Sequence, residues 1–90
     1  MIAKRELHIL NKMGLHARPA AEFVRCVRTF KSQITLQKGD EEFSGSSILE
    51  ILMANLDCGS SVLIVANGSD AEPALNKLEA LLYEFKLQEG

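Results

Sequence analysis

Four short segments of this chain have the patterns of strands, and in the first two apolar residues alternate with polar ones, as they do in half-buried strands. In the first segment, Leu7 and Ile9 share one face and leave His8 on the other. A glycine between polar residues at positions 38–40 favours a tight hairpin turn between the second and third. The fourth is β-branched and apolar enough for a central strand. The four predicted strands are residues 5–10, 34–36, 42–44 and 61–66.

Three further segments have helical patterns: two repeat apolar residues every three or four positions, as helices packed on a core do, and the one between them is apolar almost throughout. They cover residues 17–30, residues 48–56 and a last stretch that starts near Asp70. Ser46 or Ser47 caps the second helix, and Pro73 suits the first turn of the third. The predicted order is β-α-β-β-α-β-α. Such a set of elements favours an α+β fold whose sheet has one face covered by helices and one solvated face.

Length and composition place these elements in a single domain, residues 1–90. A hydrophobic content of 47% with 24% charged residues argues against disorder, and a net charge of −2 indicates no nucleic-acid partner. The chain shows no leader of signal-peptide type and no apolar run near the roughly 20 residues that span a membrane. We therefore expect a cytoplasmic monomer that does not insert into membranes.

The segment Gly14-Leu15-His16-Ala17-Arg18-Pro19-Ala20-Ala21 places a histidine where an extended stretch gives way to a helix. A helix start offers unpaired backbone N–H groups, here those of Ala17 and Arg18, and the positive end of the helix dipole. His16 adds a nitrogen nucleophile, and the Arg18 guanidinium can bind phosphate oxygens. This combination predicts a phosphohistidine site that needs neither a metal nor a cofactor.

These residues resemble the active-site motif of the HPr family, the histidine-containing phosphocarriers of the bacterial phosphoenolpyruvate-dependent phosphotransferase system. The resemblance continues through residues 22–24, 33–36, 47–49 and 59–66, so it covers nearly the whole chain. It implies an open-faced sandwich, in which a four-stranded antiparallel sheet carries three helices on one face. It also implies a carrier that is not itself an enzyme: enzyme I phosphorylates Nδ1 of His16, and the group passes to enzyme IIA domains during sugar uptake.

The first two helices carry candidate docking residues beside the motif. Arg25 and Arg28 continue a basic stripe from the motif along the first helix, which suits an acidic partner surface but also fits an ordinary solvated face. The second helix is apolar almost all the way round, with residues 51 and 54 best placed for the core. This leaves Ile48, Leu49 and Leu52 either as an apolar docking patch or as residues covered by loops.

Ser47 aligns with the serine that a dedicated enzyme, HPr kinase/phosphorylase, phosphorylates in many HPr proteins. The same residue has a structural role as a helix cap, so regulation and capping both remain open. Two neighbours depart from the family pattern: Ser46 stands where lysine is frequent, and Glu50 replaces a glycine or lysine. An added carboxylate near Ser47 can hinder a kinase or alter the choice of partner.

Three other functions are considered: one differs from the sugar-uptake carrier only in its partner, and two fit the sequence less well. A carrier of the nitrogen-related branch, of NPr type, shares the histidine motif and is the main alternative. An RNA-binding module is disfavoured because the predicted strands lack exposed aromatics, and an autonomous enzyme because no second acid–base residue accompanies His16. His8 has no second histidine for a metal site and reads as a surface residue. Cys26 and Cys58 lie in apolar stretches, so we expect both thiols to be at least partly buried.

Overall fold

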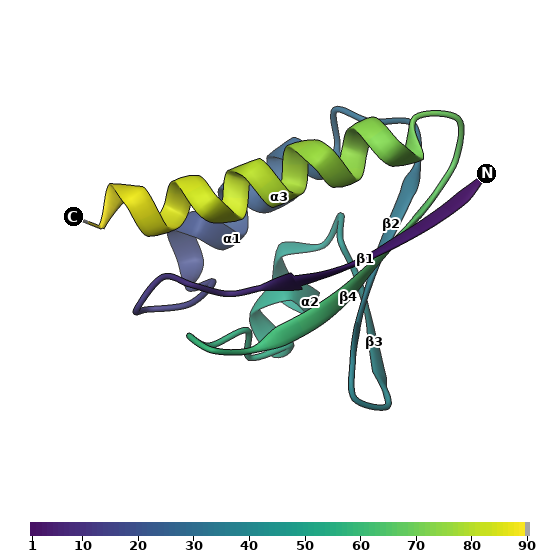
Figure 1. Ribbon diagram of the computed structural model, residues 1–90. Helices are drawn as coiled ribbons and strands as arrows, with labels where there is room; N and C mark the ends of the chain where they lie inside the picture. The colour runs from purple at the N-terminus through teal and green to yellow at the C-terminus, as the bar shows by residue number, and fades with distance from the viewer. Residues whose placement is uncertain (90) are drawn as a thin grey trace.

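The computed structural model describes residues 1–89 and shows a four-stranded antiparallel sheet with three helices on one face (Figure 1). The strands are β1 (Ile2–His8), β2 (Gln33–Lys38), β3 (Glu41–Ser44) and β4 (Ser61–Asn67), in the spatial order β1-β4-β2-β3. The helices are α1 (Ala17–Val27), α2 (Ile48–Met53) and α3 (Ala71–Gln88). The predicted element order and the open-faced sandwich are confirmed.

Strand β4 occupies the middle of the sheet because both of its edges are paired. It pairs with β1 along the whole strand, from Ile2 opposite Asn67 to His8 opposite Ser61, and with most of β2 on its other side. Its inward residues Val62, Ile64 and Ala66 are buried, as the apolar run predicts. The outer strand β3 joins β2 through the predicted turn at residues 39–40.

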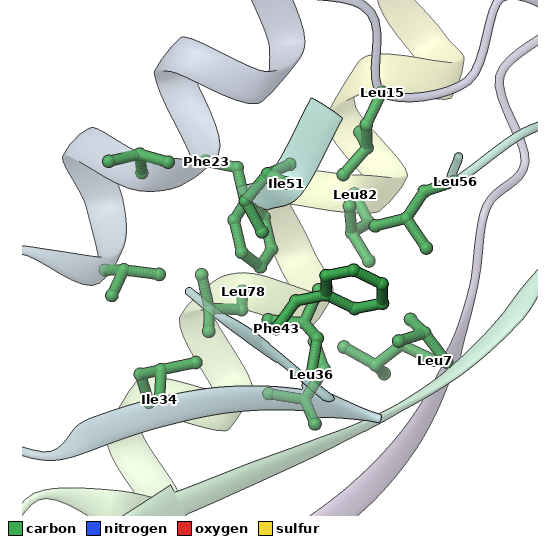
Figure 2. Close-up of a cluster of buried hydrophobic side chains, with 14 of the residues drawn as sticks. Leu7, Leu15, Phe23, Ile34, Leu36, Phe43, Ile51, Leu56, Leu78 and Leu82 are labelled. Atoms are coloured by element: carbon green, nitrogen blue, oxygen red, sulfur yellow. The ribbon is translucent and has the colours of Figure 1, made fainter. Parts of the chain in front are cut away.

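The hydrophobic core lies between the sheet and the helices and draws on every element. In Figure 2, Phe23 of α1 and Ile51 of α2 point toward Leu36 of β2, with Leu78 of α3 close by. Burying one such side chain contributes roughly 1.5–3 kcal/mol, so the core fixes how the helices lie on the sheet. Since α1 and α2 carry the candidate site residues, the same packing determines where those residues lie. Within residues 1–89, no helix is long and apolar enough to cross a bilayer.

Both helices near the site end earlier than their apolar pattern predicts. Helix α1 ends at Val27 rather than at residue 30, because Thr29 and Phe30 form tighter bonds to carbonyls three residues back. Helix α2 ends at Met53 rather than at residue 56, since Asn55 adopts a left-handed conformation with φ of 50°. The ammonium of Lys38 then donates to the carbonyls of Ala54 and Asn55, at 3.1 and 2.6 Å.

Other predicted details are confirmed or corrected locally. Strand β1 covers residues 2–8 rather than 5–10, but Leu7 and Ile9 are buried as expected and His8 is exposed. Cys26 is partly buried, and burial raises the pKa of its thiol. The prediction for Cys58 is wrong. That thiol is exposed because it lies in the turn closed by the bond from Ser60 N–H to the Asp57 carbonyl, outside β4.

The carboxylate of Asp70 joins the start of α3 to the connection between α1 and β2. It accepts hydrogen bonds from the backbone N–H groups of Lys31 and Ser32, at 2.9 and 2.8 Å, and from the Ser32 hydroxyl. The Ser32 hydroxyl and then the Lys31 N–H are the main causes that lower the pKa of Asp70 below its ordinary value. These bonds stabilise the charged form, so they tie folding stability to the ionisation of Asp70.

Replacing Asp70 by asparagine should therefore destabilise the domain near neutral pH and have a smaller effect in acid. Because the folded pKa is lowered, the contribution of the carboxylate is complete above about pH 4 and is lost as the pH falls through the folded pKa. Urea unfolding of both proteins across this range measures the difference. Asp40→Asn, in the exposed β2–β3 turn, is the matched control. If the difference in the free energy of unfolding between the wild type and Asp70→Asn did not change with pH, this role of the carboxylate would be contradicted.

Candidate functional site

A tight turn at residues 11–14 presents the motif. The N–H of Gly14 donates to the Asn11 carbonyl at 3.1 Å, and the Asn11 side-chain amide donates back to the Gly14 carbonyl at 2.7 Å. The next residue, Leu15, is buried, and its N–H donates to the Leu56 carbonyl at 2.9 Å. The turn is therefore fastened both to itself and to the segment that follows α2, which fixes where His16 begins the helix.

His16 is the N-cap residue of α1, as the motif predicts. Its backbone is extended, with φ of −77° and ψ of −171°, and its carbonyl accepts the first helical bond from Ala20. Pro19 has no N–H, so the unpaired donors of this first turn are those of Ala17 and Arg18, which bond to no acceptor within residues 1–89. Exposed imidazole and free N–H groups therefore meet at one helix end, where the dipole favours an anion.

The imidazole of His16 faces back toward the turn. Its Nδ1 lies 3.2 Å from the Gly14 carbonyl oxygen, the same oxygen that Asn11 binds. A carbonyl can only accept, so this contact is a hydrogen bond only when Nδ1 carries the proton. When this bond forms, the lone pair of the neutral ring lies on Nε2. Nδ1 becomes free to act as a nucleophile only when the ring turns away from Gly14.

His16 and Arg18 line one open cleft of about 480 Å³ between the start of α1 and the end of α3. The Arg18 side chain is 89% exposed, and its Nε lies 3.9 Å from Glu22, which also lines the cleft. The guanidinium thus rests beside a carboxylate rather than on the imidazole. At the opposite wall, Glu89 accepts a 2.7 Å bond from the backbone N–H of Lys12. Asn11, Glu22 and Glu89 also line this cleft, although none of them belongs to the histidine motif.

The two arginines further along α1 differ in their surroundings. Arg25 is exposed and makes no hydrogen bond or ion pair within residues 1–89. Arg28 is also exposed, but its Nη2 donates to the Ser46 carbonyl at 2.9 Å and so links α1 to the loop before α2. The basic stripe exists, therefore, but one member also has a structural contact. Their role in docking stays a prediction.

Helix α2 leaves an apolar surface beside the site. Ile48, Leu49 and Leu52 are exposed, so no loop of the described chain covers them, and Leu49 is 68% exposed. Met13 and Met53, which the apolar pattern of the helix did not single out, extend this surface, and Met13 lies next to Gly14. We call these five residues the apolar patch. It reaches the motif, because Met13, Leu52 and His16 share a small hollow of about 160 Å³.

Ser47, rather than Ser46, caps α2. Its hydroxyl accepts a bond from the Glu50 N–H at 3.2 Å, and the Glu50 carboxylate accepts one from the Ser44 N–H at 2.9 Å. The arrangement differs from a capping box, in which Glu50 would accept from the Ser47 N–H, but it gives both residues a structural role at the start of α2. A phosphate on Ser47 would have to share the helix start with the Glu50 carboxylate. Regulation at Ser47 stays a prediction.

Comparison with known proteins identifies the family to which this arrangement belongs. Residues 3–84 match the family model PTS-HPr, described as the phosphorylation site of the HPr component of the phosphotransferase system. The chain belongs to the HPr family of phosphocarrier proteins. The match spans the turn at Gly14, His16 and all three helices except the last residues of α3.

Named relatives of this HPr-family chain include more than one kind of carrier. It is 35% identical to the phosphocarrier protein HPr of Borreliella burgdorferi, over 94% of this chain and 99% of that protein. It is 34% identical to the phosphocarrier protein NPr of Shewanella violacea, over 88% and 87%. An HPr crystal structure from Thermoanaerobacter tengcongensis matches with a TM-score of 0.88 and 36% identity, over 92% and 93%.

Solved relatives also include dimers. An HPr dimer from T. tengcongensis matches with a TM-score of 0.73 and 38% identity, over 87% of this chain and 90% of that one. The expected monomeric state of this HPr-family chain therefore stays a prediction.

Gly14 should tolerate alanine poorly. It has φ of +64°, and a Cβ there would clash with the Leu56 carbonyl and approach Asp57 Cα to 2.8 Å. We expect Gly14→Ala to lower the free energy of unfolding by about 2–4 kcal/mol, from the strained φ and the forced shift together. Gly39→Ala is the control, because Gly39 has φ of +61° with nothing within 4 Å of a Cβ. Equal losses in urea unfolding would rule out the clash.

Proposed function

We propose that this protein accepts a phosphoryl group on His16 from phospho-enzyme I and passes it to enzyme IIA domains during phosphoenolpyruvate-dependent sugar uptake. The main support is the start of α1, where an exposed imidazole lies beside two unpaired N–H groups and shares a cleft with Arg18. Membership of the HPr family supports the same chemistry. The protein then acts as a stoichiometric carrier rather than as an enzyme in its own right.

The transfer needs only groups that the site and the partner supply. The lone pair of neutral Nδ1 attacks the phosphorus, while the N–P bond of the donor phosphohistidine breaks and its electron pair returns to the donor ring. The N–H groups of Ala17 and Arg18 stabilise the phosphoryl oxygens, and the Arg18 guanidinium moves from Glu22 toward them. The reverse set of bond changes passes the group to the next protein, so no cofactor is required.

A carrier of the nitrogen-related branch is the alternative, and the NPr relative at 34% identity favours keeping it. The chemistry at His16 is the same in both cases. The branches differ in the enzyme I that supplies the phosphoryl group, so the faster donor distinguishes them.

Incubation with phosphoenolpyruvate and either enzyme I should add one acid-labile phosphoryl group, and His16→Ala should abolish it. Intact mass before and after acid treatment measures the adduct. His8→Ala is the matched control, because His8 is the only other histidine in the chain and lies exposed on β1. Loss of the adduct in the His8 variant alone, or no adduct with either donor on a folded protein, would contradict the proposal.

We also propose that partners dock across α1 and the apolar patch of α2. Arg25 and Arg28 attract an acidic surface, and Leu49 and its neighbours provide the apolar contact beside His16. Both features lie on helices held against the same core, so a partner can contact them and the imidazole together.

Replacing Arg25 by glutamate should slow phosphoryl transfer from enzyme I several-fold at low salt, and the difference should shrink as salt screens the charge. Arg25 suits this test better than Arg28 because it makes no contact that holds the fold within residues 1–89. Lys4→Glu makes the same charge change at an exposed position of β1 and is the control. Stopped-flow transfer rates that fall equally in both variants would show a general charge effect and no docking site at Arg25.

A further inference from the structure

The Gly14 carbonyl is the meeting point of two side chains, and one of them has no part in the chemistry described so far. Asn11 is only 3% exposed, and its amide donates to this carbonyl at 2.7 Å. The Nδ1 of His16 lies on the same oxygen at the longer distance of 3.2 Å. A carbonyl oxygen has two lone pairs and can accept both bonds at once.

The hydrogen bond from His16 Nδ1 to the Gly14 carbonyl keeps Nδ1 from acting as a nucleophile. It holds the neutral ring in the form with the proton on Nδ1, whereas attack by Nδ1 requires the proton on Nε2 and the ring turned toward the N–H groups of α1. If His16 were the only donor, turning the ring would leave a buried carbonyl without a partner, which folded proteins avoid. Asn11 supplies a second donor that does not leave.

We propose that Asn11 is a positioning residue, whose amide keeps the Gly14 carbonyl paired while the His16 ring turns to expose Nδ1. This inference rests on the proposed carrier function for its purpose but not for its geometry. Asn11 thereby lowers the free energy needed to release the His16 ring from the Gly14 carbonyl, and it does not contact the phosphoryl group. Its own burial and its place in the 11–14 turn keep the amide on the carbonyl in both ring orientations.

The tautomer of His16 tests the proposal directly. In ¹⁵N-labelled protein, long-range ¹H–¹⁵N spectra of the neutral ring report which ring nitrogen carries the proton. In Asn11→Ala the ratio of Nδ1–H to Nε2–H forms should rise about fivefold or more, because the carbonyl is left to His16 alone. Asn11→Ser, which keeps a shorter donor, should recover part of the change.

Glu89→Ala is the control for simple loosening of the turn, because it removes the acceptor of the Lys12 N–H and leaves both donors on the Gly14 carbonyl. Its tautomer ratio should match the wild type. The same variants can be tested as phosphoryl acceptors for enzyme I. With Asn11→Ala as the acceptor, the kcat of enzyme I should fall by a similar factor while its KM for the acceptor stays unchanged. A wild-type tautomer ratio in Asn11→Ala, or an equal shift in Glu89→Ala, would overturn the proposal.

Wild-type protein gives an independent answer if Asn11→Ala fails to fold. The Asn11 side-chain amide protons should keep their hydrogen-bonded shifts after His16 is phosphorylated, and loss of those shifts would overturn the proposal. The outcomes also separate the two proposals. An altered tautomer ratio with no phosphorylation by any enzyme I would sustain the role of Asn11 and reject the carrier. Normal phosphorylation of the protein, together with an unaltered tautomer ratio in Asn11→Ala, would support the carrier function and reject the role of Asn11.

Discussion

The turn before α1 fixes the backbone of His16, and the contacts that hold this turn reach into the core of the fold. Only glycine fits at position 14 of the turn, because φ there is positive and the backbone of residues 56–57 lies where a side chain would be. Leu15 then enters the core and bonds to the Leu56 carbonyl. The next residue can therefore be exposed and still start the helix at a fixed place.

The packing of the helices on the sheet also determines where the apolar patch lies. Helix α2 has only six residues, too few to be stable alone, so it depends on Ile51 in the core, the Ser47 cap and the Lys38 bonds at its end. These contacts use one side of the helix and its two ends. The remaining apolar side chains of the helix stay exposed within residues 1–89 and, with Met13, form the apolar patch next to His16.

The sequence was sufficient to predict the order of the elements and the position of His16 at the start of α1. Both predictions rest on local signals, namely hydrophobic periodicity and the glycine and proline of the motif. Helix ends were harder to predict. The end of α2 depends on Lys38, which is distant in sequence, and on the left-handed Asn55, so the apolar pattern ran past it. Cys58 sits in a similar apolar stretch, yet the turn after Asp57 exposes it.

The sequence indicated only some of the contacts that the site side chains make. Arg18 fits phosphate chemistry by type, but its position beside Glu22 follows from a helical spacing of four residues that the motif itself does not include. Glu89 reaches the cleft only because α3 runs across the fold (Figure 1). One guanidinium thus shares the cleft with two carboxylates. In the proposed transfer, a phosphoryl group would compete with Glu22 for Arg18, and this modest competition would suit a group that has to leave again.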